Sequence, residues 1–130
     1  MKKRSFIIFL FFLTPLIFSW TSCGKIAFNK LEGQWRLIPV HNMQTSDIEE
    51  WWFTDGFLQI YVNFLKKSEA QYATAANFAA RTEIIITDNT NPDYKNVMGN
   101  WKILTLNGEV LSMIKTENGM MSKEFEKVSD

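Results

Sequence analysis

This chain of 130 residues contains one cysteine, one histidine and three prolines. With a single cysteine it can form no internal disulfide and offers no set of thiolates to a metal. The lone histidine, His41, lies in a polar stretch, where nothing indicates the ordered site that a Ser-His-Asp triad needs. An apolar run at 6–20 has only 15 residues and contains Pro15, whereas ~20 apolar residues span a bilayer.

A net charge of either sign is also nearly absent. The chain has 14 basic and 14 acidic residues, but three of the basic ones precede residue 5. From residue 23 onward, 11 basic residues stand against 14 acidic ones, a net charge of −3. A mildly acidic domain with no basic cluster lacks the electrostatic footprint of nucleic-acid binding. We therefore predict no nucleic-acid partner.

The N-terminal segment has the pattern of a secretory signal. Lys2, Lys3 and Arg4 are followed by an uncharged stretch, 5–22, which ends at Cys23. A basic start, a short apolar centre and small residues before a cleavage site are typical of export. The segment therefore predicts that the protein leaves the cytoplasm.

Thr21-Ser22-Cys23 resembles the end of the lipobox of bacterial lipoproteins, with Trp20 at the position that is usually leucine. The resemblance implies cleavage before Cys23 and acylation of Cys23, which anchors the protein in a membrane without any protein contact. Gly24 follows in place of aspartate. By the same resemblance, this favours the outer membrane, with the domain facing the periplasm.

Three other interpretations of this segment stay open: an uncleaved membrane anchor, ordinary secretory cleavage, or a Cys23 that is simply a small buried residue. With lipidation, the chain divides into a signal peptide at 1–22, a lipidated tether at 23–30 and one domain at 31–130. That domain is small but long enough to bury a single core.

The domain reads as short strands separated by turns every 8–12 residues, the spacing of an all-β sandwich or barrel. We expect strands at 34–40, 51–54, 57–65, 70–75, 80–87, 97–106, 110–116 and 120–128. The six alanines within 69–81 also allow a helix there. Eight antiparallel strands in simple up-and-down order close most naturally into a barrel, which removes both sheet edges.

Two turn signals set the expected registers. Asp55-Gly56 predicts a two-residue hairpin turn, and the alternation then places six side chains on one buried face: Trp51, Phe53, Leu58, Ile60, Val62 and Phe64. Asn107-Gly108 predicts a second hairpin with two possible registers. A two-residue turn faces Leu104 with Leu111, whereas a three-residue turn groups Trp101, Ile103, Leu111 and Met113.

Gly33-x-Trp35 at the start of the first strand resembles the first motif of lipocalins and of small bacterial lipocalin-like lipoproteins. Trp101-x-Ile103 before Asn-Gly, and Phe125-Glu126-Lys127 in the last strand, extend the similarity as scattered positions. The resemblance implies that Gly33, Trp35 and a cation from the C-terminal region close one end of the barrel. Lys127, or alternatively Lys123, would be that cation; alternatively, Gly33 and Trp35 are an ordinary turn and a core tryptophan.

The aromatic side chains predict either a ligand pocket or a filled interior. The pocket candidates are Trp51, Phe53, Ile60, Phe64, Tyr72 and Trp101. An eight-stranded barrel is just wide enough to be packed solid with side chains or to hold one small ligand. Both interpretations stay open.

The sequence offers little to catalysis or to metal binding. In a strand the adjacent Glu49 and Glu50 point to opposite faces, unlike a glycosidase pair. The loop at 88–93 has oxygen ligands, but Pro92 occupies a position that a calcium loop needs. We therefore expect no enzyme, cofactor or metal. The expected function is binding of a small apolar ligand; the alternative is a protein partner held through an outer face with Trp52, Phe57 and Tyr61.

Overall fold

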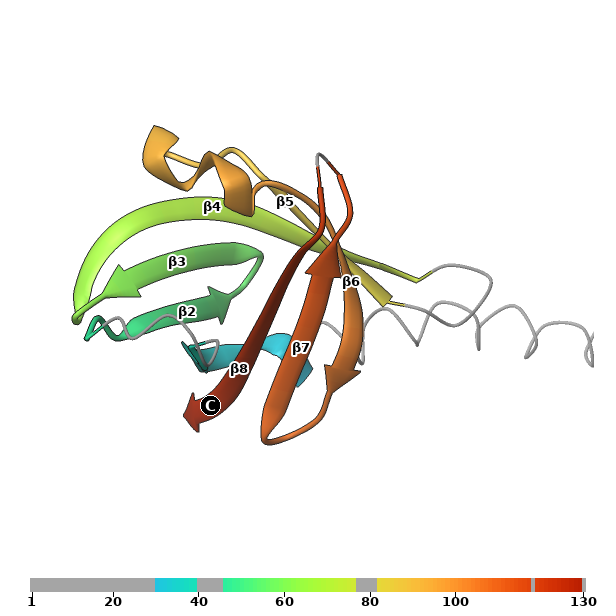
Figure 1. The fold of residues 1–130 in the computed structure, drawn as a ribbon, viewed down its shortest axis with the longest axis horizontal. Helices are drawn as coiled ribbons and strands as arrows, with labels where there is room; N and C mark the ends of the chain where they lie inside the picture. The colour runs from blue at the N-terminus through green and yellow to red at the C-terminus, as the bar shows by residue number, and fades with distance from the viewer. Residues whose placement is uncertain (1–29, 40–45, 77–81, 118, 130) are drawn as a thin grey trace, which may run out of the picture.

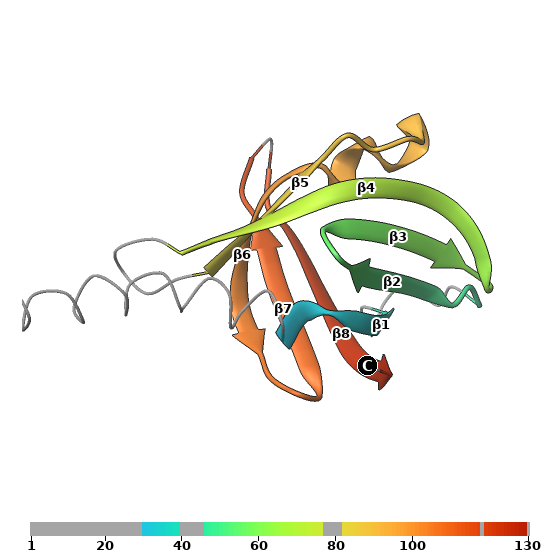
Figure 2. The ribbon, with the colours of Figure 1, turned by 180° about the vertical axis from the view of Figure 1, so that it is seen from behind.

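The computed structural model describes residues 30–39, 46–76, 82–117 and 119–129. They form a closed antiparallel barrel in which each strand pairs with its neighbours in the chain and the last pairs with the first. The strands are β1 (Gly33–Leu37), β2 (Glu49–Thr54), β3 (Phe57–Val62), β4 (Leu65–Ala76), β5 (Thr82–Thr87), β6 (Gly99–Leu106), β7 (Val110–Lys115) and β8 (Met121–Ser129). The predicted eight-stranded up-and-down barrel is confirmed. Figure 2 shows β1 between β2 and β8, where it completes the barrel.

The hairpin between β2 and β3 has the predicted register. Thr54 pairs with Phe57 and Trp51 with Ile60. Asp55 and Gly56 have φ of 48° and 83°, as the hairpin turn with two left-handed residues requires. Trp51 and Ile60 therefore share the buried face.

The predicted extent of the second strand of this hairpin, 57–65, was wrong. The strand stops at Val62, because Asn63 and Phe64 form a second left-handed turn, with φ of 52° and 67°. The turn reverses the chain before Phe64 can continue the alternation, and the Phe64 side chain is 66% exposed. Phe64 therefore does not belong to the interior or to any pocket inside the barrel.

The described part of the alanine-rich stretch, up to Ala76, forms a strand and not a helix. β4 has 12 residues and bends across the barrel in Figure 1. Its buried Tyr72 pairs with Ile86 of β5. The β-branched run of β5 offers a partner strand, and this pairing outweighs the helix propensity of alanine.

The β6–β7 hairpin combines a loop of three residues, 107–109, with a bulge. Leu106 pairs with Leu111, and the register shifts between Ile103 and Thr105. The bulge turns Leu104 outward, where it is 62% exposed. It brings together the inward face expected from the three-residue alternative: Trp101, Ile103, Leu111 and Met113.

The two ends of the barrel differ. One end, here called the η1 end, carries the β1–β2, β3–β4, β5–β6 and β7–β8 connections, and the 3₁₀ helix η1 (Pro92–Val97) lies in the third of these. The segment from 88 to 93, expected to be a loop, thus runs into a short helix, which Asn91 caps by accepting from the Asp93 N–H. The other end, called the Leu31 end, is where the described chain begins.

Candidate functional site

Trp35 lies at the Leu31 end, where its contacts join β1, β8 and the segment before β1. Its indole N–H donates to the Leu31 carbonyl at 2.7 Å, and both side chains are buried. The Lys127 ammonium lies 4.5 Å from the Trp35 ring centroid and donates to the Glu32 carbonyl at 2.6 Å. Of the two predicted candidates, the cation over Trp35 is therefore Lys127 and not Lys123. That this group closes the barrel functionally stays a prediction.

The same arrangement occurs a second time, 66 residues further along the chain. Val97-Met98-Gly99-Asn100-Trp101 repeats the pattern of Leu31-Glu32-Gly33-Gln34-Trp35. The Trp101 indole N–H donates to the Val97 carbonyl at 2.7 Å, four residues back, as in the first copy. Gly99 and Gly33 have φ of 121° and 124°, a conformation open to glycine and unfavourable for other residues.

A lysine covers the second tryptophan as well. The Lys115 ammonium lies 5.3 Å from the Trp101 ring centroid. It donates to the Met98 carbonyl at 2.9 Å and to the Asn96 carbonyl. β1 and β6 run in opposite directions, because all neighbouring strands are antiparallel. The two motifs, 31–35 and 97–101, therefore lie at opposite ends of the barrel.

The third buried tryptophan has a different lysine environment. The Lys123 ammonium lies 5.4 Å from the Trp51 ring centroid and 3.9 Å from the nearer Glu49 oxygen, Oε1. The same Glu49 oxygen accepts from the Trp51 indole N–H at 2.8 Å. Lys123 makes no hydrogen bond within the described ranges. It is the least satisfied of the three interior lysines.

Five of the six predicted pocket residues lie in the core: Trp51, Phe53, Ile60, Tyr72 and Trp101. They contact one another closely. The Trp51 ring lies edge-on to Trp101 at 6.3 Å, and Phe53 lies edge-on to Tyr72 at 5.0 Å. Burial raises the pKa of Tyr72 to about 12. These contacts favour a filled interior at this level of the barrel.

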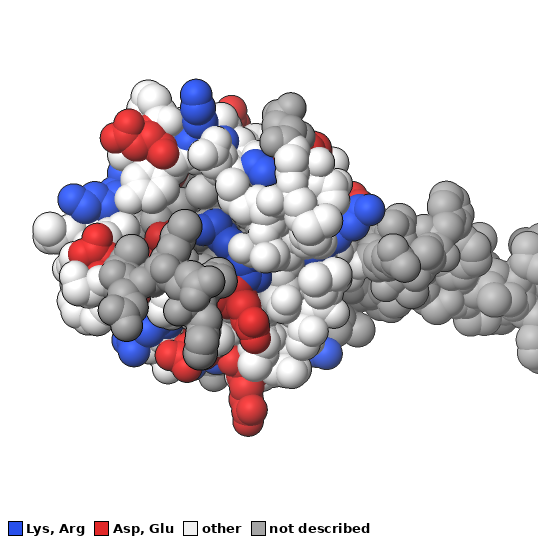
Figure 3. Space-filling view, viewed as in Figure 1, with Lys and Arg blue, Asp and Glu red and all other residues white. Residues whose placement is uncertain are grey.

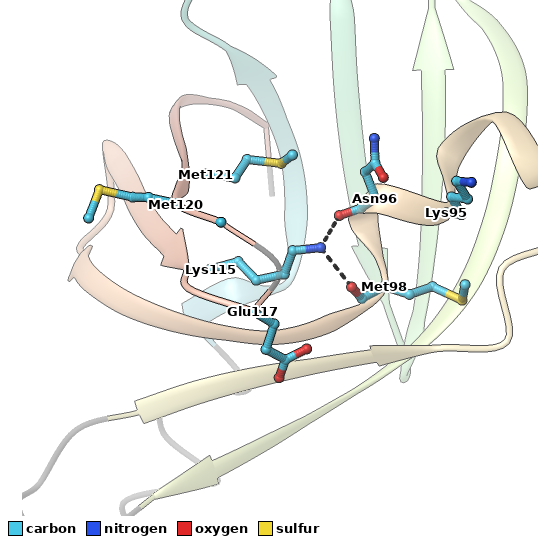
Figure 4. A pocket seen from close by; sticks show the side chains of 8 residues that line it. Lys95, Asn96, Met98, Lys115, Glu117, Met120 and Met121 are labelled. Atoms are coloured by element: carbon cyan, nitrogen blue, oxygen red, sulfur yellow. Dashed lines mark hydrogen bonds between the residues drawn. The ribbon is translucent and has the colours of Figure 1, made fainter.

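A groove opens at the η1 end, beside the second motif. Its volume is about 410 Å³. It is lined by Lys95, Asn96, Met98, Lys115, Glu117, Gly119, Met120 and Met121. Figure 4 shows the Lys115 side chain running between its walls to the carbonyl oxygens of Asn96 and Met98. None of the residues predicted from the sequence lines this groove.

The rim of the η1 end carries large apolar side chains among exposed charged ones such as Asp93 and Lys95. Each of the four connections there carries an exposed large apolar side chain: Ile38 and Ile48, Phe64 and Leu65, Met98, and Met120. Met120 is the most exposed of these, at 81%. Exposed apolar side chains beside a groove are suited to contact the apolar part of another molecule.

The outer-face aromatic residues lie together on β2 and β3. Trp52 stacks on Tyr61 with a centroid distance of 4.1 Å, and both are half-buried. Phe57, at the start of β3, is 45% exposed.

The side of the molecule seen in Figure 3 has no large surface of one charge sign, because Lys and Arg are interspersed there with Asp and Glu.

The carboxylates and the histidine add little to the site. Glu49 points inward to Trp51 and Lys123, while Glu50 lies 4.0 Å from Arg36 on the outer side. Within the described ranges, no cluster of three His, Cys, Asp or Glu residues could hold a metal ion. Those ranges likewise hold no helix long and apolar enough to cross a membrane. Cys23 and His41 lie outside the described residues.

Comparisons with known proteins identify no relative. No family model matches the chain, and neither the curated proteins nor the solved structures contain a match.

Proposed function

We propose that this protein is a lipid-anchored, lipocalin-like binding protein without catalytic activity, which takes a small and mainly apolar molecule in the groove at the η1 end. The observation that carries the proposal is the groove itself, of about 410 Å³, with Met98, Met120 and Met121 in its walls. This volume is within the ~300–1,000 Å³ of small-molecule sites, and the remaining walls carry the polar side chains of Lys95, Asn96, Lys115 and Glu117. Flexible methionine side chains adapt to ligands of irregular shape.

The packing below the groove supports a site at the rim over one deep in the barrel. Trp51, Trp101 and Phe125 are fully buried, and the Trp51 ring lies 5.0 Å from that of Phe125. A ligand entering from the η1 end would meet these rings beneath the groove.

The proposed lipid anchor would leave the η1 end, with its groove, accessible from the periplasm. The described chain begins at Lys30, seven residues after Cys23, and enters the barrel at the Leu31 end. A lipid on Cys23 would hold the Leu31 end near the outer membrane. The groove would then face away from the membrane, into the periplasm.

The first test is native mass spectrometry of a soluble form purified from the periplasm. This form carries Cys23→Ser, with residues 1–22 replaced by an ordinary cleavable signal. We expect a bound small molecule, retained in the control Leu104→Glu and lost in Met120→Glu. Both positions are exposed, so neither charge is buried. An empty domain, or equal retention in both variants, would contradict the proposed groove.

The second candidate is an accessory or inhibitor protein that binds a partner through its outer face. The stacked Trp52 and Tyr61 beside the exposed Phe57 favour it, since aromatic residues are enriched at protein interfaces. The same mass spectra test it. A bound polypeptide of defined mass, lost in Phe57→Asp and kept in Leu104→Asp, would select this function.

A further inference from the structure

The two ends of the barrel differ in the side chains that their described connections expose. At the η1 end, the β3–β4 turn carries Phe64 and Leu65, which are 66% and 64% exposed, and the β7–β8 connection carries Met120, which is 81% exposed. The described turns at the Leu31 end, 55–56 and 107–109, consist of Asp-Gly and Asn-Gly-Glu. Large apolar side chains gathered at one end are typical of an interaction surface.

Asn63 fixes the β3–β4 turn to the residues just before β2. Its backbone N–H donates to the Ile48 carbonyl at 2.8 Å, and its side-chain oxygen accepts from the Ile48 N–H at 3.0 Å. Its side-chain amide donates to Asp47 Oδ1 at 2.9 Å. Ile48 is itself 36% exposed. The apolar side chains of Ile48, Phe64 and Leu65 therefore extend from two segments that hydrogen bonds hold together.

The backbone at position 64 favours a different residue from the one that the chain has there. Phe64 has φ of 67°, a left-handed conformation that is unfavourable for a bulky side chain and readily adopted by asparagine or glycine. Its side chain also buries little surface, because two-thirds of it is exposed. Residues held in an unfavourable conformation cluster at functional sites. The phenylalanine is thus better explained by a contact outside the fold than by the fold itself.

The charges at the η1 end offer no attraction to an anionic surface. On the connections and the first residues of β4, three lysines stand against five carboxylates, a net charge of −2. These residues are Lys66, Lys67, Lys95, Asp47, Glu69, Asp88, Asp93 and Glu117. A partner of this end is therefore held by apolar contact and not by charge.

The distribution of the apolar side chains favours a lipid bilayer over a protein. They lie on separate connections, with the groove and charged residues such as Asp93 between them. A protein would need a closely packed pocket for each of them, whereas the boundary between headgroups and acyl chains accepts separate apolar side chains. The exposed Lys66 and Lys67 can lay their stems along such a surface while their ammonium groups stay in water.

From these observations we propose that the η1 end docks on a zwitterionic lipid surface, with Phe64 and Leu65 inserted below the headgroups. Because the proposed lipid anchor holds the Leu31 end, this is a second lipid surface, distinct from the one that holds Cys23. The docking does not depend on a ligand in the groove.

The test measures binding of the soluble form described above to phosphatidylcholine vesicles by flotation. This form is suitable, because the described strands close around their own core. Phe64→Asn keeps the left-handed turn and should weaken binding about tenfold, as expected for one phenylalanine side chain left in water. Urea unfolding should show this variant to be at least as stable as the unaltered protein. The matched control is Leu104→Asn, which removes a side chain 62% exposed on β6 and should leave vesicle binding unchanged.

A fluorescent label reports the contact directly. Cys23 is the only cysteine of the chain, so in the soluble form Leu65→Cys and Leu104→Cys each provide a single labelling site. An environment-sensitive dye at position 65 should shift its emission to the blue when phosphatidylcholine vesicles are added, and a dye at position 104 should not.

Three results would overturn the proposal. The first is no binding to phosphatidylcholine vesicles, or equal emission shifts at both labelled positions. The second is binding that requires anionic phosphatidylglycerol, because charge and not apolar insertion would then hold the protein. The third is a dimer in analytical ultracentrifugation that Phe64→Asn dissociates, since the turn would then contact a second copy of the chain. The ligand groove is tested separately by the mass spectra described above.

Discussion

Replacement of Trp35 by alanine tests whether the first glycine–tryptophan motif holds the Leu31 end together. The side chain is fully buried. An indole of ~200 Å² removed from water at ~25 cal/mol per Å² contributes ~5 kcal/mol. Alanine keeps a little of this, and the unfolded chain already buries some of it. The substitution also leaves the buried Leu31 carbonyl without its donor at 2.7 Å. We expect Trp35→Ala to lower the free energy of unfolding by ~3–5 kcal/mol.

The measurement is urea unfolding followed by far-UV circular dichroism, because tryptophan fluorescence changes with the substitution itself. The matched control is Trp52→Ala. Trp52 is half-buried on the outer face, and its main contact is the stack on Tyr61. It should cost roughly 1–2 kcal/mol. A loss below ~1 kcal/mol for Trp35→Ala, far under the range for such truncations, would refute the idea that Trp35 secures this end.

Three further perturbations test other parts of the molecule. Gly99→Ala should destabilise the fold by ~1–3 kcal/mol, because φ is +121° and the new Cβ would lie 2.7 Å from Glu117 Oε2; Gly108→Ala, with no atom within 4 Å, should change the urea midpoint little. The pKa of Tyr72 is raised to about 12, so above pH ~10 the unfolded state loses this proton first and stability falls as pH rises; Tyr72→Phe should remove that part of the decline between pH ~10 and ~12, and an unchanged slope would contradict it. Cys23→Ser should abolish palmitate labelling, and with an ordinary cleavable leader the protein should appear in the soluble fraction; persistent labelling would exclude Cys23 as the lipidation site.

Local sequence signals were sufficient to predict the barrel. Asp55-Gly56 fixed both the turn and the register of β2 and β3, because few residues accept two successive left-handed conformations. The turn at Asn63-Phe64 carried no such signal. Phenylalanine rarely takes a positive φ. The strand alternation therefore predicts that Phe64 is buried, whereas it is exposed in the turn.

Long-range pairing limited what the sequence could reveal about the site. Lysines in strands are normally assigned to the solvent face. Lys123 was therefore named only as an alternative cation over Trp35, and Lys115 was not named, although both face inward. The groove is formed by η1 and the β7–β8 connection, which no local pattern brings together. The bulge at Leu104 was equally hidden, because the turn signal at Asn107-Gly108 allowed two registers.

The repeated motif was visible in the sequence, yet its meaning depends on topology. An apolar residue, a glycine, an amide residue and a tryptophan recur at 31–35 and 97–101 with identical spacing. Only the closed strand order shows that each tryptophan has a lysine from the neighbouring strand over its ring. Sequence reasoning named Trp101 as a pocket residue and did not identify it as the counterpart of Trp35.

The difference between the two motifs bears directly on where a ligand can bind. In the first, the Lys127 ammonium donates to the carbonyl of Glu32, in the segment that begins the domain. In the second, Lys115 holds Met98 and also the last turn of η1 through Asn96, and Met98 lines the groove. Lys115, which lies over the buried Trp101 ring, thus holds the backbone of one wall of the proposed site. A backbone fixed before binding loses little conformational entropy when a ligand arrives. Lys115 thus fixes the backbone from which the Met98 side chain enters the proposed site, while that side chain and the exposed Met120 stay free to adapt.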